Sequence, residues 1–262
     1  MKHLLLTVIL LLFSSSAFSQ TINAEQIIEQ SQRAFYYAAD DMRAKVTMQL
    51  IDADGGTRNR VMTMLRLNET EGSKQKYFIY FHEPGDVRRM TFMVWKDPVK
   101  EDQRWIFIPA VDLVRRIAAN DKRSSFVGSD FTYEDISGRD VDADSHTLLR
   151  EEQLDGRESY VIQSIPKEAV EYTKRISWID KQNLLPLKEA YYDAQDELYR
   201  VFTADKIEEI GGWPTVTQRS MKNVKTGHRT KVVFDTIVYD LGLVDKDFSE
   251  RRMRRPPRAW IE

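Results

Sequence analysis

Apolar and polar residues alternate along most of this chain, and a period of two is typical of β-strands with one buried face. Residues 45–51, for example, place Val46, Met48 and Leu50 on the same face. Segments that alternate in this way, or that are rich in aromatic and β-branched residues, lie at 45–51, 57–67, 75–82, 90–95, 104–108, 147–150, 159–165, 173–179, 186–193, 197–208, 215–223 and 228–239. Short links such as residues 193–196 favour antiparallel pairing of neighbours. The pattern therefore predicts a mainly β protein with one large antiparallel sheet and few helices.

Two segments break the strand pattern. Residues 23–39 carry an apolar stripe at helical spacing, and Asn23 with Gln26 forms a capping-box pair, so a helix is expected there. Residues 110–140 are irregular but contain several aromatic and aliphatic residues, which favours a packed lid over a disordered loop. A sheet this wide tends to curl, and the helix and the insert would then cover its concave face. Alternation leaves open whether the enclosed space is packed core or an apolar cavity.

The first 19 residues have the three parts of a secretory signal peptide. Lys2 precedes the apolar run 4–13, and Ala17 and Ser19 stand before a cleavage site at Gln20. An apolar run of this length spans about 15 Å as a helix, too short for a hydrocarbon core of about 30 Å. The short signal is typical of bacteria. It predicts a mature chain of residues 20–262, a single domain, in the periplasm.

Composition excludes several kinds of chemistry. The chain has no Cys, which removes disulfides, thiol nucleophiles and Cys-ligated metals. The four His residues show no metal-ligand spacing, and no glycine-rich phosphate loop or serine nucleophile elbow occurs. A formal net charge of -2 gives no basic field for nucleic acid. We therefore expect no metal, no cofactor, no nucleic-acid partner and no enzymatic activity.

The central motifs resemble a known family. They are WIFIP at 105–109, RRI at 115–117 and SFVGSDFTYED at 125–135, with EPG at 83–85, Met90, WID at 178–180, GWP at 212–214 and Met221 in order around them. In these features the mature chain resembles the bacterial outer-membrane lipoprotein-sorting proteins, relatives of the periplasmic carriers LolA and LolB. The resemblance is closest to a subgroup associated with transporters of the RND type.

This resemblance implies a half-barrel of about 11 antiparallel strands, a helical lid and an apolar cavity for acyl chains. The cargo would be the acyl chains of a lipoprotein or a phospholipid, moved towards the outer membrane, and an RND-type inner-membrane transporter is a possible partner. The alternative is an adaptor that binds such a transporter and carries nothing. A carrier needs an apolar wall with few specific anchors, because the cavity must only approximately match a bilayer for cargo to be released.

The candidate cavity residues are apolar residues expected on one face of the sheet. They are Met48, Leu50, Leu65, Ile79, Phe81, Phe92, Val94, Trp105, Phe107, Ile176 and Trp178. The candidate lid residues are Phe126, Phe131 and Tyr133. A latch is expected to pair Arg115 or Arg116 with one of three carboxylates, those of Asp130, Glu134 and Asp135.

The C-terminus is rich in arginine. The cluster consists of Arg251, Arg252, Arg254, Arg255 and Arg258. It is expected to be a solvated tail, or to make transient contact with an anionic membrane surface or with an acidic patch of a transporter.

Overall fold

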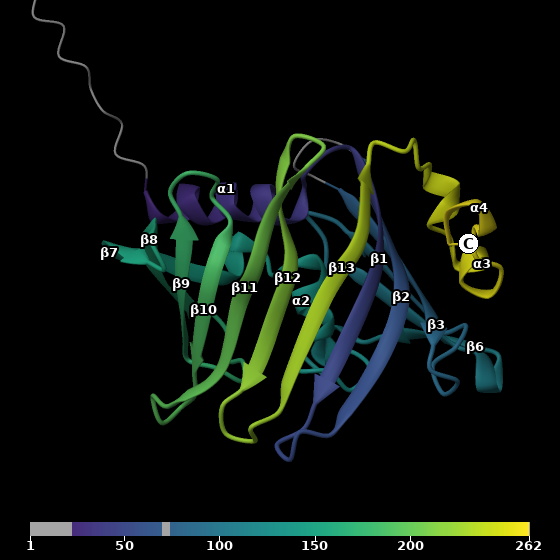
Figure 1. Ribbon diagram of the computed structural model, residues 1–262, viewed down its shortest axis with the longest axis horizontal. Helices are drawn as coiled ribbons and strands as arrows, with labels where there is room; N and C mark the ends of the chain where they lie inside the picture. Colours follow the sequence, from purple (N-terminus) through teal and green to yellow (C-terminus); the bar gives the residue numbers. More distant parts are fainter. Residues whose placement is uncertain (1–22, 70–73, 262) are drawn as a thin grey trace, which may run out of the picture.

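The computed structural model describes residues 23–69 and 74–261. The predicted signal peptide lies outside the described residues. Figure 1 shows one curved sheet, and that sheet has 13 strands. The strands are β1 (Asp41–Ile51), β2 (Thr57–Asn68), β3 (Gln75–Glu83), β4 (Thr91–Lys96), β5 (Gln103–Ile108), β6 (Leu113–Ile117), β7 (Asp144–Leu154), β8 (Arg157–Pro166), β9 (Lys174–Asp180), β10 (Pro186–Tyr192), β11 (Leu198–Ile210), β12 (Trp213–Asn223) and β13 (Arg229–Tyr239).

The strand order is β6-β5-β4-β3-β2-β1-β13-β12-β11-β10-β9-β8-β7. The chain therefore starts in the middle of the sheet, steps outward to β6 at one edge, crosses to β7 at the other edge and returns to β13 beside β1. Every neighbouring pair is antiparallel. The predicted single antiparallel sheet is confirmed, with 13 strands in place of about 11.

Every segment predicted as a strand overlaps one, and β6 is the strand that the pattern missed. β6 is an edge strand whose Leu113, Arg115 and Arg116 are all exposed, so it shows no alternation. The first part of the predicted 110–140 lid is therefore sheet, which corrects that boundary. The connection that crosses the concave face is shorter, residues 118–143.

The helix α1 (Ala24–Tyr36) has the predicted capping box: the Asn23 side chain accepts from the backbone of Gln26 at 2.8 Å. It lies across one end of the sheet (Figure 1) and packs on β7 and β12. Ile27 and Ile28 are buried against Ile162 and Ile179 of the sheet. The predicted helix is confirmed, and it ends a few residues earlier than expected.

The connection from β6 to β7 contains η2 (Ala119–Asp121), α2 (Tyr133–Ser137) and η3 (Val141–Ala143). Short as it is, α2 has its own capping box. Thr132 Oγ1 accepts from the backbone of Asp135 at 3.1 Å, and an Asp135 carboxylate oxygen accepts from the Thr132 backbone at 2.7 Å. This closes the first turn without help from the sheet. The segment can therefore keep its local shape as a unit.

The convex face of β2–β5 is apolar, and the C-terminal segment buries it. Residues 240–261 contain η4 (Asp245–Asp247), α3 (Glu250–Arg254) and α4 (Arg258–Ile261), which lie outside the sheet beyond β2 in Figure 1. Phe248 and Met253 are fully buried in a cluster with Phe78 and Met93. The expectation of a free C-terminal tail is wrong: the backbone is docked and the heads of Arg251, Arg254 and Arg255 stay exposed.

Two histidines make stability depend on pH. Burial lowers the pKa of both His82 and His146 below the ordinary 6.5. His82 shares a 2.9 Å hydrogen bond with Thr63, and His146 contacts Ser164 at 2.8 Å. The unfolded chain therefore binds more protons than the folded one in mildly acidic solution.

We expect the free energy of unfolding to be highest above pH 6.5 and to fall as the pH drops below that value. The slope should be at most about 1.4 kcal/mol per pH unit for each histidine. Urea denaturation between pH 7.5 and 5.5 measures this, and the double variant His82→Gln, His146→Gln should flatten the profile. An equally steep profile in that variant would assign the pH dependence to other groups.

Candidate functional site: the covered concave face

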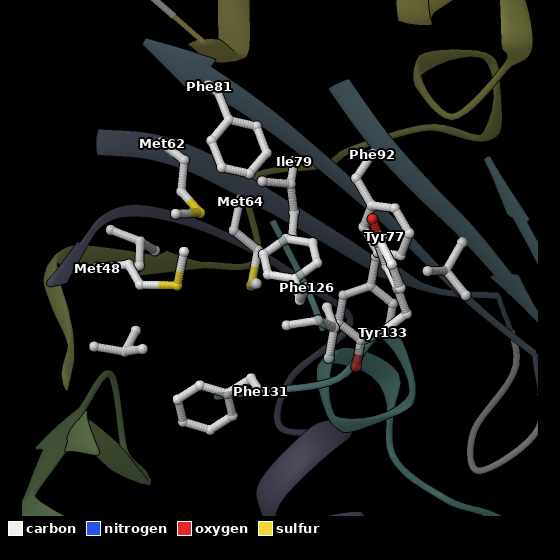
Figure 2. Packing of buried hydrophobic residues seen from close by; sticks show 14 of the residues in the cluster. Met48, Met62, Met64, Tyr77, Ile79, Phe81, Phe92, Phe126, Phe131 and Tyr133 are labelled. Carbon is white, nitrogen blue, oxygen red and sulfur yellow. The ribbon is translucent and has the colours of Figure 1, made fainter. Parts of the chain in front are cut away.

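The concave face carries a continuous apolar surface on β1–β5 and β13. Figure 2 shows Met48, Met62 and Met64 on this surface beside Ile79, Phe81 and Phe92. These inward residues follow the alternation of each strand, so that Met62 and Met64 face inward while Leu65 faces outward. Thioether side chains are flexible, and a wall rich in Met adapts to ligands of different shape.

The lid fills this surface with its own side chains. Phe126, Phe131, Tyr133 and Ile136 all come from the 118–143 connection and lie in the same buried cluster as the sheet residues. The Phe126 ring lies 5.3 Å from that of Phe92. Aromatic pairs at such distances contribute beyond their burial. The lid thus occupies the space that an apolar ligand would need.

What remains open under the covering segments is small. A cavity of about 20 Å³ lies between Met48, Met64 and Phe126. Another of about 50 Å³ lies below the end of α1, and a third of about 60 Å³ lies between α1, the lid and β9–β12. Spaces of this size hold a few water molecules. The expected hollow large enough for an acyl chain is therefore not open in this arrangement.

The half of the concave face over β9–β12 carries buried charged side chains. The alternation of the sequence does not predict this polar half. Arg175 on β9 pairs with Glu189 on β10 at 3.3 Å, and Arg200 on β11 pairs with Asp135 of the lid at 3.0 Å. Burial lowers the pKa of Arg200, but Asp135 together with Tyr191, Tyr199 and Glu171 raises it overall. The charged residues of β9–β11 could have been noticed in the sequence, since they occupy inward positions of otherwise alternating strands.

The lid carboxylates make ion pairs, but not with the predicted partners. The Asp130 carboxylate contacts His228 Nδ1 at 2.6 Å, and it accepts from Thr230 Oγ1 at 2.8 Å. Asp135 pairs with Arg200.

Glu134 is also paired, with Arg139 at 3.4 Å. Arg115 and Arg116 are exposed on β6, and among the described residues neither forms an ion pair with Asp130, Glu134 or Asp135. The predicted latch cations are therefore wrong: β6 lies at the sheet edge, while the actual partners are Arg200 on β11, His228 just before β13 and Arg139 within the connection itself.

The predicted cavity residues divide between the two faces. The concave cluster contains Met48, Leu50, Ile79, Phe81, Phe92 and Val94, as expected. Leu65, Trp105 and Phe107 instead belong to the convex cluster under the C-terminal segment. Alternation identifies two faces but not which one is concave, and here both are apolar.

Ile176 and Trp178 are a second correction. On β9 the concave positions are Arg175, Ser177 and Ile179, so Ile176 and Trp178 point to the opposite face. The ammonium of Lys188 lies 4.8 Å from the centre of the Trp178 ring on that side.

Two buried arginines of the concave face have no acidic partner in the part of the chain that the structure describes. Arg66 on β2 is 4 % exposed and Arg219 on β12 is 8 % exposed. Among the described residues, neither has a carboxylate oxygen within 4.0 Å. The guanidinium of Arg219 lies between the rings of Phe35, Phe131 and Phe234, at 5.4, 5.4 and 5.1 Å. The alternation predicts neither arginine, although Arg66 follows Met62 and Met64 on the inward face of β2.

The described part of the chain contains no cluster of three or more His, Asp or Glu residues that could hold a metal ion. Within the same residues, no helix has the length and apolar character needed to cross a bilayer.

Comparison with known proteins places this chain in a family. The family model that matches residues 73–255 is described as "Uncharacterized protein", and the chain belongs to this family. None of the curated proteins matches the sequence.

Solved structures extend this result. The chain is 27% identical to an outer membrane lipoprotein-sorting protein domain from Vibrio parahaemolyticus, with a TM-score of 0.81 over 88% of this chain and 98% of that one. It is 29% identical to a DUF1329 family protein from Desulfovibrio piger, with a TM-score of 0.78 over 87% and 95% of the two chains.

A LolA superfamily protein from Nitrosomonas europaea shares the fold at 19% identity, with a TM-score of 0.67 over 88% of this chain and 99% of that one. These findings confirm the resemblance to the lipoprotein-sorting group and the LolA-like sheet.

Proposed function

We propose that this protein is a periplasmic carrier that shields acyl chains of a lipid or lipoprotein during transfer towards the outer membrane, without catalysing a reaction. One observation carries the proposal. A single connection places Phe126, Phe131, Tyr133 and Ile136 on an otherwise continuous apolar surface. An acyl chain could replace those side chains and restore the burial. The lipoprotein-sorting domain from Vibrio parahaemolyticus, similar in sequence and fold, adds support.

In this proposal the arrangement described above is the closed form, in which the lid side chains cover the apolar surface. Burial of an acyl chain gains about 0.8 kcal/mol per CH₂, and a bilayer offers the same gain. Displacing the lid costs free energy that is subtracted from the intrinsic affinity. The lid thereby keeps binding weak enough for release into a membrane, which a permanently open apolar cavity would not do.

The second candidate is an adaptor for an RND-type transporter that carries nothing. The small size of the remaining cavities favours it, since the lid side chains fill most of the space under the lid. The two candidates differ in what the protein holds after purification.

Native mass spectrometry of protein taken from the periplasm tests them. A carrier should retain a lipid-sized mass, and the delipidated protein should take up a pyrene-labelled phospholipid from vesicles. An adaptor should show neither, and that result would overturn the carrier proposal.

The C-terminal arginines would bring the carrier to a membrane surface. Arg251, Arg254 and Arg255 are exposed on a docked segment, so their charges are held in place. Each such charge near an anionic surface contributes about 1 kcal/mol. Replacing the three by Glu should reduce the affinity for phosphatidylglycerol vesicles, measured by co-sedimentation at low salt, by tenfold or more. A tenfold loss of affinity corresponds to about 1.4 kcal/mol of binding free energy. Binding that is unaffected would remove this segment from the membrane contact.

A further inference from the structure

The cavity below the end of α1 collects hydrogen-bond donors that have no acceptor. Arg66, Tyr77 and Arg219 all line it. The Nε of Arg66, the Nε of Arg219 and the hydroxyl of Tyr77 are buried and have no hydrogen-bond partner among the described residues. Unpaired buried donors are costly and uncommon in native proteins. Three of them around one cavity of about 50 Å³ mark a place where an acceptor is missing.

The charge at this cavity is positive. Arginine stays charged at neutral pH, even though burial lowers the pKa of Arg66 and Arg219. The carboxylates that act on them electrostatically are already engaged. Asp41 accepts from the backbone N–H groups of residues 241–243, and Asp135 pairs with Arg200. Within residues 23–69 and 74–261, Arg66 makes one hydrogen bond, from Nη2 to the Ala38 carbonyl, and its charge has no counterion.

The cavity also adjoins the apolar half of the concave face. Met64, Ile136, Phe234 and Arg219 line both this cavity and the small one between Met48 and Phe126. A ligand with a polar end at the arginines could therefore extend its apolar end along the Met-rich wall. The aromatic rings around Arg219 would keep water away from such a contact and strengthen it.

We propose that Arg66, Tyr77 and Arg219 bind the anionic head group, a carboxylate or a phosphate, of the amphiphile whose chain replaces the lid side chains. This inference rests on the proposed carrier function and adds the class of cargo: an amphiphile with a negatively charged head. Guanidinium groups suit oxyanions because they donate parallel N–H bonds to two oxygens. Tyr77, whose pKa burial raises, supplies a neutral O–H donor.

The test compares four probes on the delipidated protein by isothermal titration calorimetry. Oleate and oleoyl lysophosphatidate carry a charged head on the same chain, monoolein carries a neutral head, and inorganic phosphate carries no chain. The native protein should bind both anionic lipids at least about tenfold more tightly than monoolein, as charge-assisted hydrogen bonds imply. It should bind phosphate far more weakly than lysophosphatidate.

Arg219→Met and Arg66→Met should each remove most of this preference by weakening the two anionic lipids much more than monoolein, and Tyr77→Phe should reduce it less. Arg58→Met, an exposed residue on the same strand as Arg66, is the matched charge control and should bind like the native protein. The thermal unfolding midpoint of Arg219→Met without ligand should be equal or higher, because a buried cation without a counterion is removed. A structural arginine would instead lower the midpoint and weaken all lipids equally.

The outcomes separate the two proposals. Equal affinity for oleate and monoolein in the native protein would overturn the head-group site and leave the carrier standing. Phosphate binding as tight as lysophosphatidate would assign the arginines to a free anion and also overturn the inference. Failure of every lipid probe would contradict the carrier function itself.

Discussion

Replacement of Phe126 by Ala should lower the free energy of unfolding by roughly 3 kcal/mol and at the same time increase lipid uptake. Phe126 is 1 % exposed, and its ring contacts those of Phe81, Phe92 and Tyr133. Loss of the ring removes the contacts of the lid with Phe81 and Phe92 of the sheet. A lid held less firmly subtracts less from the affinity for an acyl chain. Urea denaturation and uptake of pyrene-labelled phospholipid measure the two effects.

Phe248→Ala is the matched control for this experiment. Phe248 is fully buried as well, but on the convex face under the C-terminal segment. The substitution should destabilise the protein by a similar amount and leave lipid uptake at the native level. If both variants changed uptake alike, the effect would come from general loosening, and Phe126 would have no special place in the lid.

The second large effect is expected from Asp41→Asn. The Asp41 carboxylate is 3 % exposed and accepts three backbone hydrogen bonds of 2.8 Å, from Leu241, Gly242 and Leu243. Hydrogen bonds to a charged group contribute about 1.5–3 kcal/mol each, and an amide can replace only part of them. We expect a loss of roughly 3 kcal/mol and release of the C-terminal segment from β2–β5.

Trypsin provides a direct readout of that release, because the segment carries the arginine cluster at residues 251–258. The Asn variant should be cleaved there faster than the native protein under conditions in which the sheet stays intact. Asp240→Asn is the control: Asp240 is exposed and accepts one bond, from the backbone of Asp40 at 3.0 Å. Cleavage that is equally slow in both variants would show that the segment is held by its apolar contacts alone.

The sheet could be predicted well because a strand with one buried face has a recognisable local sequence pattern. The alternation at residues 45–51 and the capping box at Asn23 are set by near neighbours. β6 shows no such alternation, because most of its side chains are exposed at the edge of the sheet. Local patterns therefore found the elements but not the edge of the sheet.

The site was predicted less well because its contacts are not local. Asp130 and His228 are 98 residues apart, and Asp135 and Arg200 are 65 apart, so nothing in sequence spacing pairs them. The predicted latch of Arg115 or Arg116 involves residues of the same sequence segment as the lid carboxylates, whereas Arg200 and His228 come from distant segments. The outward position of Leu65, Trp105 and Phe107 depends on the C-terminal segment, whose docking no alternation reveals.

The crossing connection has a mechanical consequence. Because residues 118–143 join β6 to β7, the lid is anchored at both edges of the sheet. The distance between those edges then determines how far the lid connection is stretched. A change in the curvature of the sheet changes that distance. Anything that flattens the sheet, whether a docked partner or a membrane pressed against the arginine-rich side, would pull on the lid from a distance without touching it.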